Sequence, residues 1–319
     1  MKFGIHNPSF VFGPDSSEMF EGLKAKAQWA ENNGFAWFSV MDHLIQIPWI
    51  GPSDEPFMEG WTAITALAAV TSRIRLATLV SSVAYRNPAL LAKIASNVDV
   101  ISRGRVTLGI GAGWFDEEYR QYGWEFPPKP AVRIRQMEEA VQLILAMWRE
   151  KRATFHGRYF RIEDAILEPK PVQKPHPPVM IAGGGEQMTL RVVARYGDMC
   201  NVAGTPADVQ RKFAILRSHC ESVGRNFGAI EKTNITSLLL ARTEAELAAK
   251  RSRLGVGAAF NGFAGTVEAA MNLIGTYRDA GVDMLIASIA KNDAETMQLL
   301  ASEIVPKFDA ASPVSSAAR

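Results

Sequence analysis

Residues 74–110 read IRLATLVSSVAYRNPALLAKIASNVDVISRGRVTLGI. The apolar runs at 74–82 and at 106–110 have the length and composition of strands buried on both faces. Between them, Pro88 opens a segment that reaches Ile101 and carries its apolar residues at helical spacing. This order of strand, helix and strand predicts two parallel strands joined by a right-handed crossover.

The same alternation extends over most of the 319-residue chain. Helical segments separate the apolar runs that we expect to be strands, at residues 2–6, 35–41, 74–82, 106–110, 179–182, 198–203, 233–241 and 282–289. Eight such units favour an α/β fold of the closed (β/α)₈ TIM-barrel type. The alternation by itself also allows an open, doubly wound sheet.

Two stretches interrupt this repeat. The segment 151–163 predicts a β-hairpin turned at His156-Gly157, and 168–178 is a proline-rich connector that we expect to be extended. Together they indicate an insertion at about residues 122–178, between the fourth and fifth barrel strands. We expect residues 1–308 to form a single domain and the Ala- and Ser-rich residues 309–319 to form a disordered tail.

Composition narrows the classes of function. The 35 basic and 33 acidic residues give a net charge of +2, which favours neither nucleic acid nor an anionic membrane as a partner. The two cysteines, the absence of a visible secretory signal and the absence of a long apolar stretch predict a cytoplasmic protein. The histidines show no metal-ligand spacing, so we expect no metal site. Rossmann, P-loop and Gly-x-Ser-x-Gly motifs are also missing.

The run Gly183-Gly184-Gly185 follows the fifth expected strand. Glycine lets the backbone approach a ligand closely, and a helix expected at 186–196 would offer unpaired N–H groups to an anion. A phosphate bound by Ala182 to Glu186 is one interpretation. A tight strand-to-helix turn without a ligand is the other.

Asp42 and His43 come directly after the second expected strand. In a TIM barrel the active site lies at the carboxyl ends of the strands, so this pair belongs to the candidate site. A neutral His43 could donate a hydrogen bond to a ring or to a substrate oxygen. A histidine at the rim held by Asp42 for structural reasons explains the pair equally well.

The segment Gly111-Ala112-Gly113 follows the fourth expected strand. It could let a flat ring lie against the backbone, or it could relieve crowding at the mouth of the barrel. Trp114 could wall an aromatic pocket or belong to the core, and Glu117 and Glu118 could supply a carboxylate or favour a helix dipole. The remaining candidates at the expected strand ends are Leu79, Val80, Ser81 and Asn201.

Five segments carry a resemblance to a known family. They are FSVMDHL at 38–44, LATLVSSVAYRNPALLAKIASNVDVISRGRVTLGIGAGWFDEEY at 76–119, RIRQMEEAVQLILAMW at 133–148, EPKPVQKPHPPVMIAGGGEQMTLRVVARYGDMCN at 168–201 and GTVEAAMNLIGTYRDAGVD at 265–283. In this order and spacing the chain resembles the bacterial luciferase-like monooxygenase superfamily, and most closely its branch dependent on the deazaflavin coenzyme F420. The resemblance covers residues 1–305.

The resemblance implies a TIM barrel that is usually a homodimer and holds a cofactor ring at its mouth. A non-proline cis peptide would lie at the end of the third strand, around Leu79-Val80-Ser81. The cofactor phosphate would fall at residues 182–186. Asp42 and His43 would match the family's Asp-His pair, whose histidine lies near the reactive ring carbon. Gly111, Ala112, Gly113, Glu117 and Asn201 would also contact the cofactor.

The resemblance thus implies hydride transfer between coenzyme F420 and a small-molecule substrate. An FMN-dependent monooxygenase that uses oxygen and a non-catalytic flavin-binding barrel are the two alternatives. The longer acidic tail of F420 would need basic residues such as Lys129, Arg133 and Arg135, although a solvated face also explains them. In the family's sugar-phosphate dehydrogenase a proton-donating glutamate stands where this chain has Trp114. This departure argues against a sugar phosphate and favours a flatter, more aromatic substrate.

Overall fold

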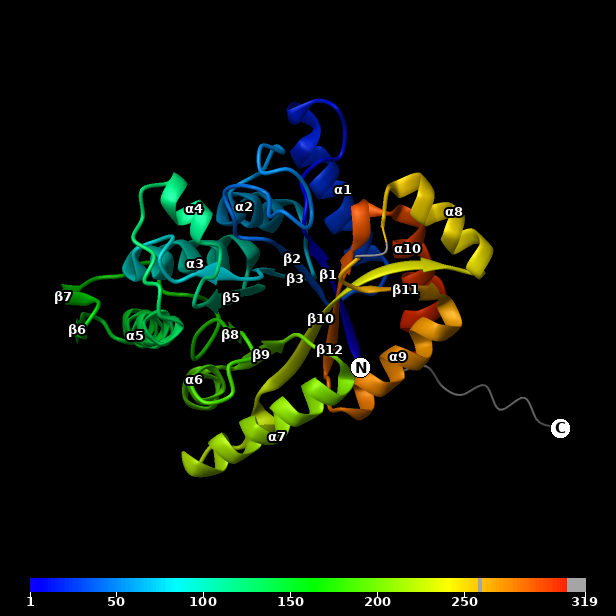
Figure 1. Cartoon of the computed structure of the whole chain (residues 1–319). Coiled ribbons are helices and arrows are strands. Elements are labelled where there is room, and N and C mark those ends of the chain that lie inside the picture. Colours follow the sequence, from blue (N-terminus) through cyan, green and yellow to red (C-terminus); the bar gives the residue numbers. More distant parts are fainter. Residues whose placement is uncertain (258–259, 309–319) are drawn as a thin grey trace.

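The computed structural model describes residues 1–257 and 260–308, and within them eight parallel strands close into a barrel (Figure 1). Each strand pairs with the next along the chain, and β1 also pairs with the last strand, with Lys2 opposite Met284. The closed TIM-barrel prediction is therefore confirmed, and the open sheet is excluded. The barrel strands are β1 (Lys2–Asn7), β2 (Trp37–Val40), β3 (Arg75–Thr78) with its continuation β4 (Ser81–Ser82), β5 (Val106–Gly111), β8 (Val179–Ala182), β9 (Met199–Val202), β10 (Glu231–Ala241) and β12 (Met284–Ile289).

Helices surround the barrel and cover the outer faces of its strands (Figure 1). They are α1 (Met19–Asn32), α2 (Gly60–Val70), α3 (Pro88–Ser102), α4 (Asp116–Gln121), α5 (Pro130–Arg149), α6 (Thr189–Tyr196), α7 (Pro206–Ser222), α8 (Glu244–Leu254), α9 (Val267–Asp279), α10 (Ala294–Leu299) and α11 (Val305–Phe308), with a π-helical turn at Leu300–Ile304. Short 3₁₀ turns lie at Ser16–Glu18, Phe227–Ala229 and Ala290–Asn292.

Apolar side chains fill the interior of the barrel toward the amino-terminal ends of its strands. Trp37, Met180, Met199, Met284 and Ile286 pack together there and are almost fully buried. A strand whose two faces are both covered, by helices outside and by this cluster inside, needs apolar residues on both faces. That need explains the near-continuous apolar runs in the sequence. It also leaves the carboxyl ends of the strands as the open end of the barrel.

The insertion forms as expected between the fourth and fifth barrel strands. β6 (Ala153–His156) and β7 (Arg161–Ala165) make an antiparallel hairpin that projects from the barrel (Figure 1). The connector that follows contains cis peptide bonds at Glu168–Pro169 and Lys174–Pro175.

Two elements differ from the sequence-based expectations, and one predicted segment lies outside the described residues. α6 begins at Thr189 rather than at residue 186, because residues 186–188 form a turn. A further strand, β11 (Phe263–Thr266), pairs with the end of β10 and was not expected. The predicted tail at 309–319 lies outside the described residues. In the part of the chain that is described, no helix has the length and apolar character needed to cross a bilayer.

Candidate functional site

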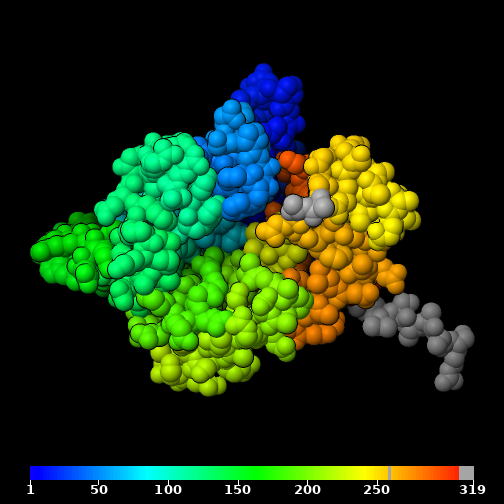
Figure 2. All heavy atoms as spheres, in the orientation of Figure 1, coloured from blue at the N-terminus to red at the C-terminus, as the bar shows by residue number. Residues whose placement is uncertain are grey.

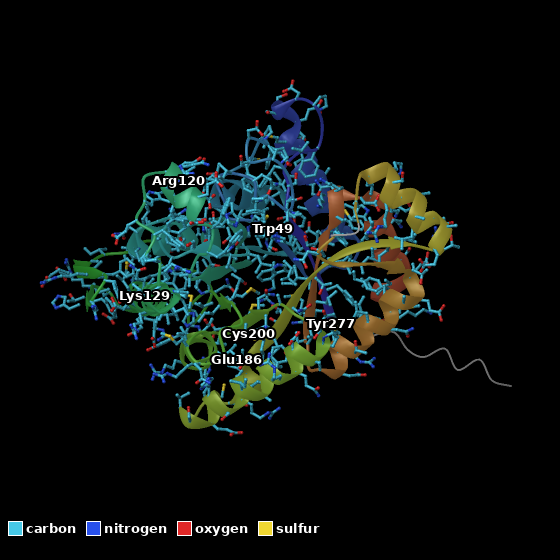
Figure 3. All side chains as sticks on the ribbon, viewed as in Figure 1. Trp49, Arg120, Lys129, Glu186, Cys200 and Tyr277 are labelled. Carbon is cyan, nitrogen blue, oxygen red and sulfur yellow. The ribbon has the colours of Figure 1, made fainter. Side chains whose placement is uncertain are left out.

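A cavity of about 1090 Å³ opens at the carboxyl ends of the barrel strands. The segment around residue 50 stands beside it, between the residues of α4 and those of α8 (Figure 2). Figure 3 places Trp49 near the middle of the ring of helices, with Glu186 and Tyr277 on another side of that ring. The sequence-predicted residues that line this cavity are Asp42, His43, Leu79, Val80, Gly111, Ala112, Gly113, Trp114, Ala182, Gly183, Gly185 and Asn201. Ser81, Glu117, Gly184 and Glu186 are predicted residues that do not line it.

His43 is held at the cavity wall by Glu118. The Nδ1 atom of His43 lies 2.8 Å from Glu118 Oε2, and the Tyr85 hydroxyl donates to the same carboxylate. The backbone N–H groups of Leu44 and Ile45 donate to Glu118 Oε1. An ionised carboxylate only accepts hydrogen bonds, so Nδ1 of the His43 ring carries a hydrogen and donates it to Glu118. Nε2 is left without a protein partner among the described residues.

The charge of Glu118 follows from these contacts. Its side chain is fully buried, and burial alone raises the pKa of a carboxyl group. The hydrogen bonds from His43 and Tyr85 and from the Leu44 N–H outweigh burial and bring the pKa of Glu118 below its ordinary value. Burial, together with the same carboxylate, raises the pKa of Tyr85, which therefore stays a hydrogen-bond donor. Glu118 is thus an ionised carboxylate near neutral pH.

The prediction that placed Glu117 at the cofactor site is not supported by its position. Glu117 lies on the outer side of α4, where it accepts from Gln121 Nε2 at 3.0 Å and lies 3.8 Å from Arg120. The next residue, Glu118, points inward instead. In a helix successive side chains are about 100° apart, so only one of two adjacent glutamates can face the barrel.

The carboxylate of Asp42 bonds Arg86 rather than the ring of His43. Its two carboxylate oxygens accept from the Arg86 guanidinium at 2.7 and 2.8 Å, and Arg86 also pairs with Glu59. Asp42 is fully buried, and this bidentate pair compensates its charge. The interpretation in which Asp42 holds His43 is therefore wrong. Asp42 connects the end of β2 to the loop that precedes α3.

Leu79 and Val80 interrupt the third barrel strand between β3 and β4. A cis peptide bond joins them, as the resemblance implied, and both side chains line the cavity. The glycines of β5 pack against this interruption. A Cβ on Gly109 would collide with the Thr78 carbonyl oxygen, and one on Gly111 would lie 2.9 Å from Val80 Cγ2. Relief of crowding at the mouth is thus one role of the β5 glycines.

Two further residues of the predicted site have structural partners. Ser81 Oγ accepts from Trp61 Nε1 at 2.8 Å and lies 2.9 Å from Thr78 Oγ1, so it anchors β4 to α2 rather than facing the cavity. Asn201 does line the cavity, and its Nδ2 donates to Thr233 Oγ1 at 2.8 Å. That bond fixes the orientation of the Asn201 side chain at the end of β9.

The glycine run forms a cradle next to α6. Gly183 has a φ of 129°, which side chains with a Cβ rarely adopt. A Cβ on Gly184 would lie 2.7 Å from Lys212 Nζ, and one on Gly185 would lie 2.8 Å from Thr189 Oγ1. An ammonium group and a hydroxyl group therefore come close to the backbone here. Both are donors suited to a phosphate. Thr189 lines the cavity, whereas Lys212 lies behind Gly184, where its Nζ donates to the Ala203 carbonyl oxygen at 2.8 Å.

Glu186 takes no part in that cradle. It pairs with Arg211, and its carbonyl oxygen lies 2.8 Å from His219 Nε2. α6 starts three residues later than expected, so Glu186 lies in the preceding turn. Its carboxylate is therefore directed toward α7.

Sequence reasoning missed His6 and Trp49, which also line the cavity. His6 lies at the end of β1, and its Nδ1 is 3.0 Å from Ser39 Oγ. Burial, with the nearby charge of Lys26, lowers the pKa of His6 to about 3, so this ring is neutral. The position of His6 after an apolar run was a signal that could have revealed it. Trp49 lies in a loop without periodicity and offered no such signal.

Comparisons with known proteins agree with this geometry. Residues 1–302 match the family model described as luciferase-like monooxygenase. A pyrimidine monooxygenase RutA of Allorhizobium ampelinum is 32% identical over 225 residues, which cover 68% of this chain and 59% of the relative. An F420-dependent glucose-6-phosphate dehydrogenase of Kineococcus radiotolerans is 31% identical over 247 residues, which cover 73% of this chain and 66% of the relative.

The fold has also been seen in solved structures. An F420-dependent secondary alcohol dehydrogenase in complex with an F420-acetone adduct superposes with a TM-score of 0.79, at 19% identity, over 96% of this chain and 98% of the other. That similarity concerns the fold. The match of the family model over nearly the whole chain decides the membership: the chain belongs to the luciferase-like monooxygenase family.

Proposed function

We propose that this chain is an oxidoreductase that transfers hydride between the deazaflavin coenzyme F420 and a small organic substrate. The observation that carries the proposal is that three features line one cavity. They are the interrupted strand at Leu79-Val80, the side chain of His43 and the glycine run at Gly183. Relatives of this chain include both an F420-dependent dehydrogenase and pyrimidine monooxygenases. FMN with oxygen is therefore the competing proposal.

The residues present fit a flat ring with a phosphate-bearing chain. Leu79 and Val80 offer an apolar surface for one face of the ring, and they rest on the apolar cluster that fills the barrel. Gly183, Gly185 and Thr189 line another part of the same cavity, where the Thr189 hydroxyl and the first N–H groups of α6 would be donors for the phosphate. A surface for the ring and a surface for the phosphate thus belong to one cavity.

When bound, coenzyme F420 would accept or donate the hydride and would react poorly with oxygen, because it lacks the flavin nitrogen that favours that reaction. The chain's own residues would orient the substrate and handle the proton. His43 Nε2, held by the bond from Nδ1 to Glu118, is the group placed to exchange a hydrogen bond or a proton with a substrate oxygen. The apolar lining would keep water from the reacting atoms.

A titration tests the choice of cofactor. The purified protein is mixed with increasing F420 and, separately, with FMN, and the visible absorbance and the fluorescence of each cofactor are followed. We expect saturable binding of F420 and weaker binding of FMN. Tight binding of FMN without binding of F420 would overturn the proposal in favour of the monooxygenase. The same titration with Thr189→Val should weaken binding of FMN more than binding of riboflavin, which has no phosphate.

A further inference from the structure

Two tryptophans lie stacked at the edge of the cavity. The ring centroids of Trp49 and Trp114 are 4.8 Å apart with an interplanar angle of 27°. Both line the cavity, and both are strongly exposed, Trp49 by 59% and Trp114 by 47%. The other five of the chain's seven tryptophans are buried or half-buried. The exposed indole surface is therefore gathered at one place on the molecule, next to the candidate site.

The indole pair continues inward to a buried aromatic ring. The Trp114 ring also stacks on Phe115, at 5.1 Å and 27°. Phe115 is 94% buried, since only 6% of it is exposed, and it packs with Met41 and Ile47. The buried Phe115 ring thus holds Trp114 in place, and Trp49 is the outermost of the three stacked rings. An outer aromatic ring exposed to water presents an uncovered apolar face.

The stack lies beside His43. The His43 ring meets Trp114 edge to face, with centroids 5.7 Å apart and an interplanar angle of 70°. A molecule that lies against the indoles is therefore adjacent to the imidazole whose Nε2 has no partner among the described residues. The stacking surface and an imidazole nitrogen able to bond a ligand thus lie next to each other at the cavity wall.

Arg133 contributes a cation to the lining of the cavity next to the indole pair. Its guanidinium donates to the carbonyl oxygens of Gly113, Pro127 and Pro128 and lies 4.2 Å from the Phe126 ring centroid. These partners are neutral, so they hold the guanidinium in place without cancelling its charge. The stacked indole rings, rather than the charge of the rim, are therefore what selects the ligand at this point.

We propose that Trp49 and Trp114 form a platform that binds the substrate, and that the substrate is a planar aromatic or conjugated molecule. This inference rests on the proposed function, because it assigns the substrate of the same site. Planar ligands gain from stacking because two π systems attract one another in an offset parallel arrangement. A saturated ring of similar size has no such face.

A matched pair of ligands tests the platform. The probes are 2-naphthol and decahydro-2-naphthol, which share one hydroxyl group and the two-ring skeleton but differ in planarity. Their dissociation constants are measured by calorimetry with the protein saturated by whichever cofactor it binds. We expect the wild-type protein to prefer 2-naphthol by about fivefold, the size of effect that one aromatic pair produces. In Trp49→Ala this preference should fall to near unity, and Trp49→Phe should retain most of it.

Tyr122→Ala is the matched control. Tyr122 is an aromatic residue of similar exposure, 48%, that does not line the cavity, so its removal should leave the preference unchanged. Equal binding of both probes by the wild-type protein would overturn the inference, as would an unchanged preference in Trp49→Ala. A changed sedimentation coefficient in Trp49→Ala with an unchanged preference would place Trp49 in a subunit contact and would also overturn it. Failure of F420 to bind would overturn the proposed function alone, since the preference is measured with either cofactor.

Discussion

Asp42 and His43 are neighbours in the chain, but they belong to two polar clusters of opposite character. Asp42 forms a closed cluster with Arg86 and Glu59, in which charges of opposite sign meet and the Asp42 carboxylate is compensated within the protein. His43 forms an open cluster with Glu118 and Tyr85, in which one nitrogen of the imidazole has no partner in the described part of the chain. Both clusters contain a buried carboxylate, so burial does not separate them.

The difference shows how a structural charge can be told from a functional one. In a closed cluster the carboxylate oxygens are already bonded to a cation, and removal of that cation would leave a buried charge unpaired. In an open cluster the carboxylate orients a second side chain, and that side chain lines a cavity with an atom still able to bond a ligand. Substitutions in the first cluster should therefore change the free energy of unfolding, and substitutions in the second should change turnover.

The largest effect is expected for His43→Ala. His43 is the group that we propose exchanges a hydrogen bond or a proton with the substrate, so its loss should lower kcat/KM by about 1000-fold, within the usual range for general acid–base catalysis. The dissociation constant of the cofactor, measured by absorbance titration, should change little. His156→Ala serves as the control, because His156 is an exposed histidine on the β6–β7 hairpin. A His43→Ala protein with nearly wild-type turnover would show that the open cluster is structural.

The second effect is expected in the closed cluster. Arg86→Met leaves the carboxylate of Asp42 buried without its cation, which should lower the free energy of unfolding by about 3 kcal/mol. Urea denaturation measures this change, and the turnover of the folded protein should remain close to the wild-type value. Arg120→Met removes an exposed arginine that lies 3.8 Å from Glu117 and should cost less than about 1 kcal/mol. Equal losses in the two variants would contradict the description of the Asp42 cluster.

The sequence allowed the barrel to be predicted because its strands are covered on both faces. Apolar runs such as 74–82 and 106–110 follow directly from that double burial. The position of Asp42 and His43 after the second strand likewise followed from the architecture. β11 was missed because Phe263–Thr266 is a short segment that directly precedes the helix α9, and its partner is only the end of β10.

The partners of the site residues could not be read from the sequence. α4 has six residues and follows Gly113, whose φ is 77°, so the rotation of that helix depends on a turn that no periodicity describes. The choice between Glu117 and Glu118 depended on this rotation. The partner of Asp42 lies 44 residues away along the chain, and such a distant ion pair leaves no local pattern. Trp49 was missed because its place at the mouth depends on the path of a loop, which likewise leaves no local pattern in the sequence.

The smallest effect, and the sharpest test of the open cluster, is expected for Glu118→Gln. Glutamine keeps the shape of the side chain, but its single amide oxygen can accept either from His43 Nδ1 or from the Leu44 and Ile45 N–H groups, and not from both. A hydrogen bond to a neutral acceptor is about half as strong as one to a carboxylate, so we expect kcat/KM to fall by about tenfold. The nitrogen chemical shifts of the His43 ring report which ring nitrogen carries the hydrogen, and they should show a smaller population with the hydrogen on Nδ1. A purely structural role of Glu118 would not change that population.

Glu117→Gln is the natural comparison, because it makes the same substitution one residue earlier on the exposed side of α4. If Glu117→Gln lowered kcat/KM as much as Glu118→Gln, or if the His43 tautomer were unchanged in Glu118→Gln, the carboxylate would not be what orients His43.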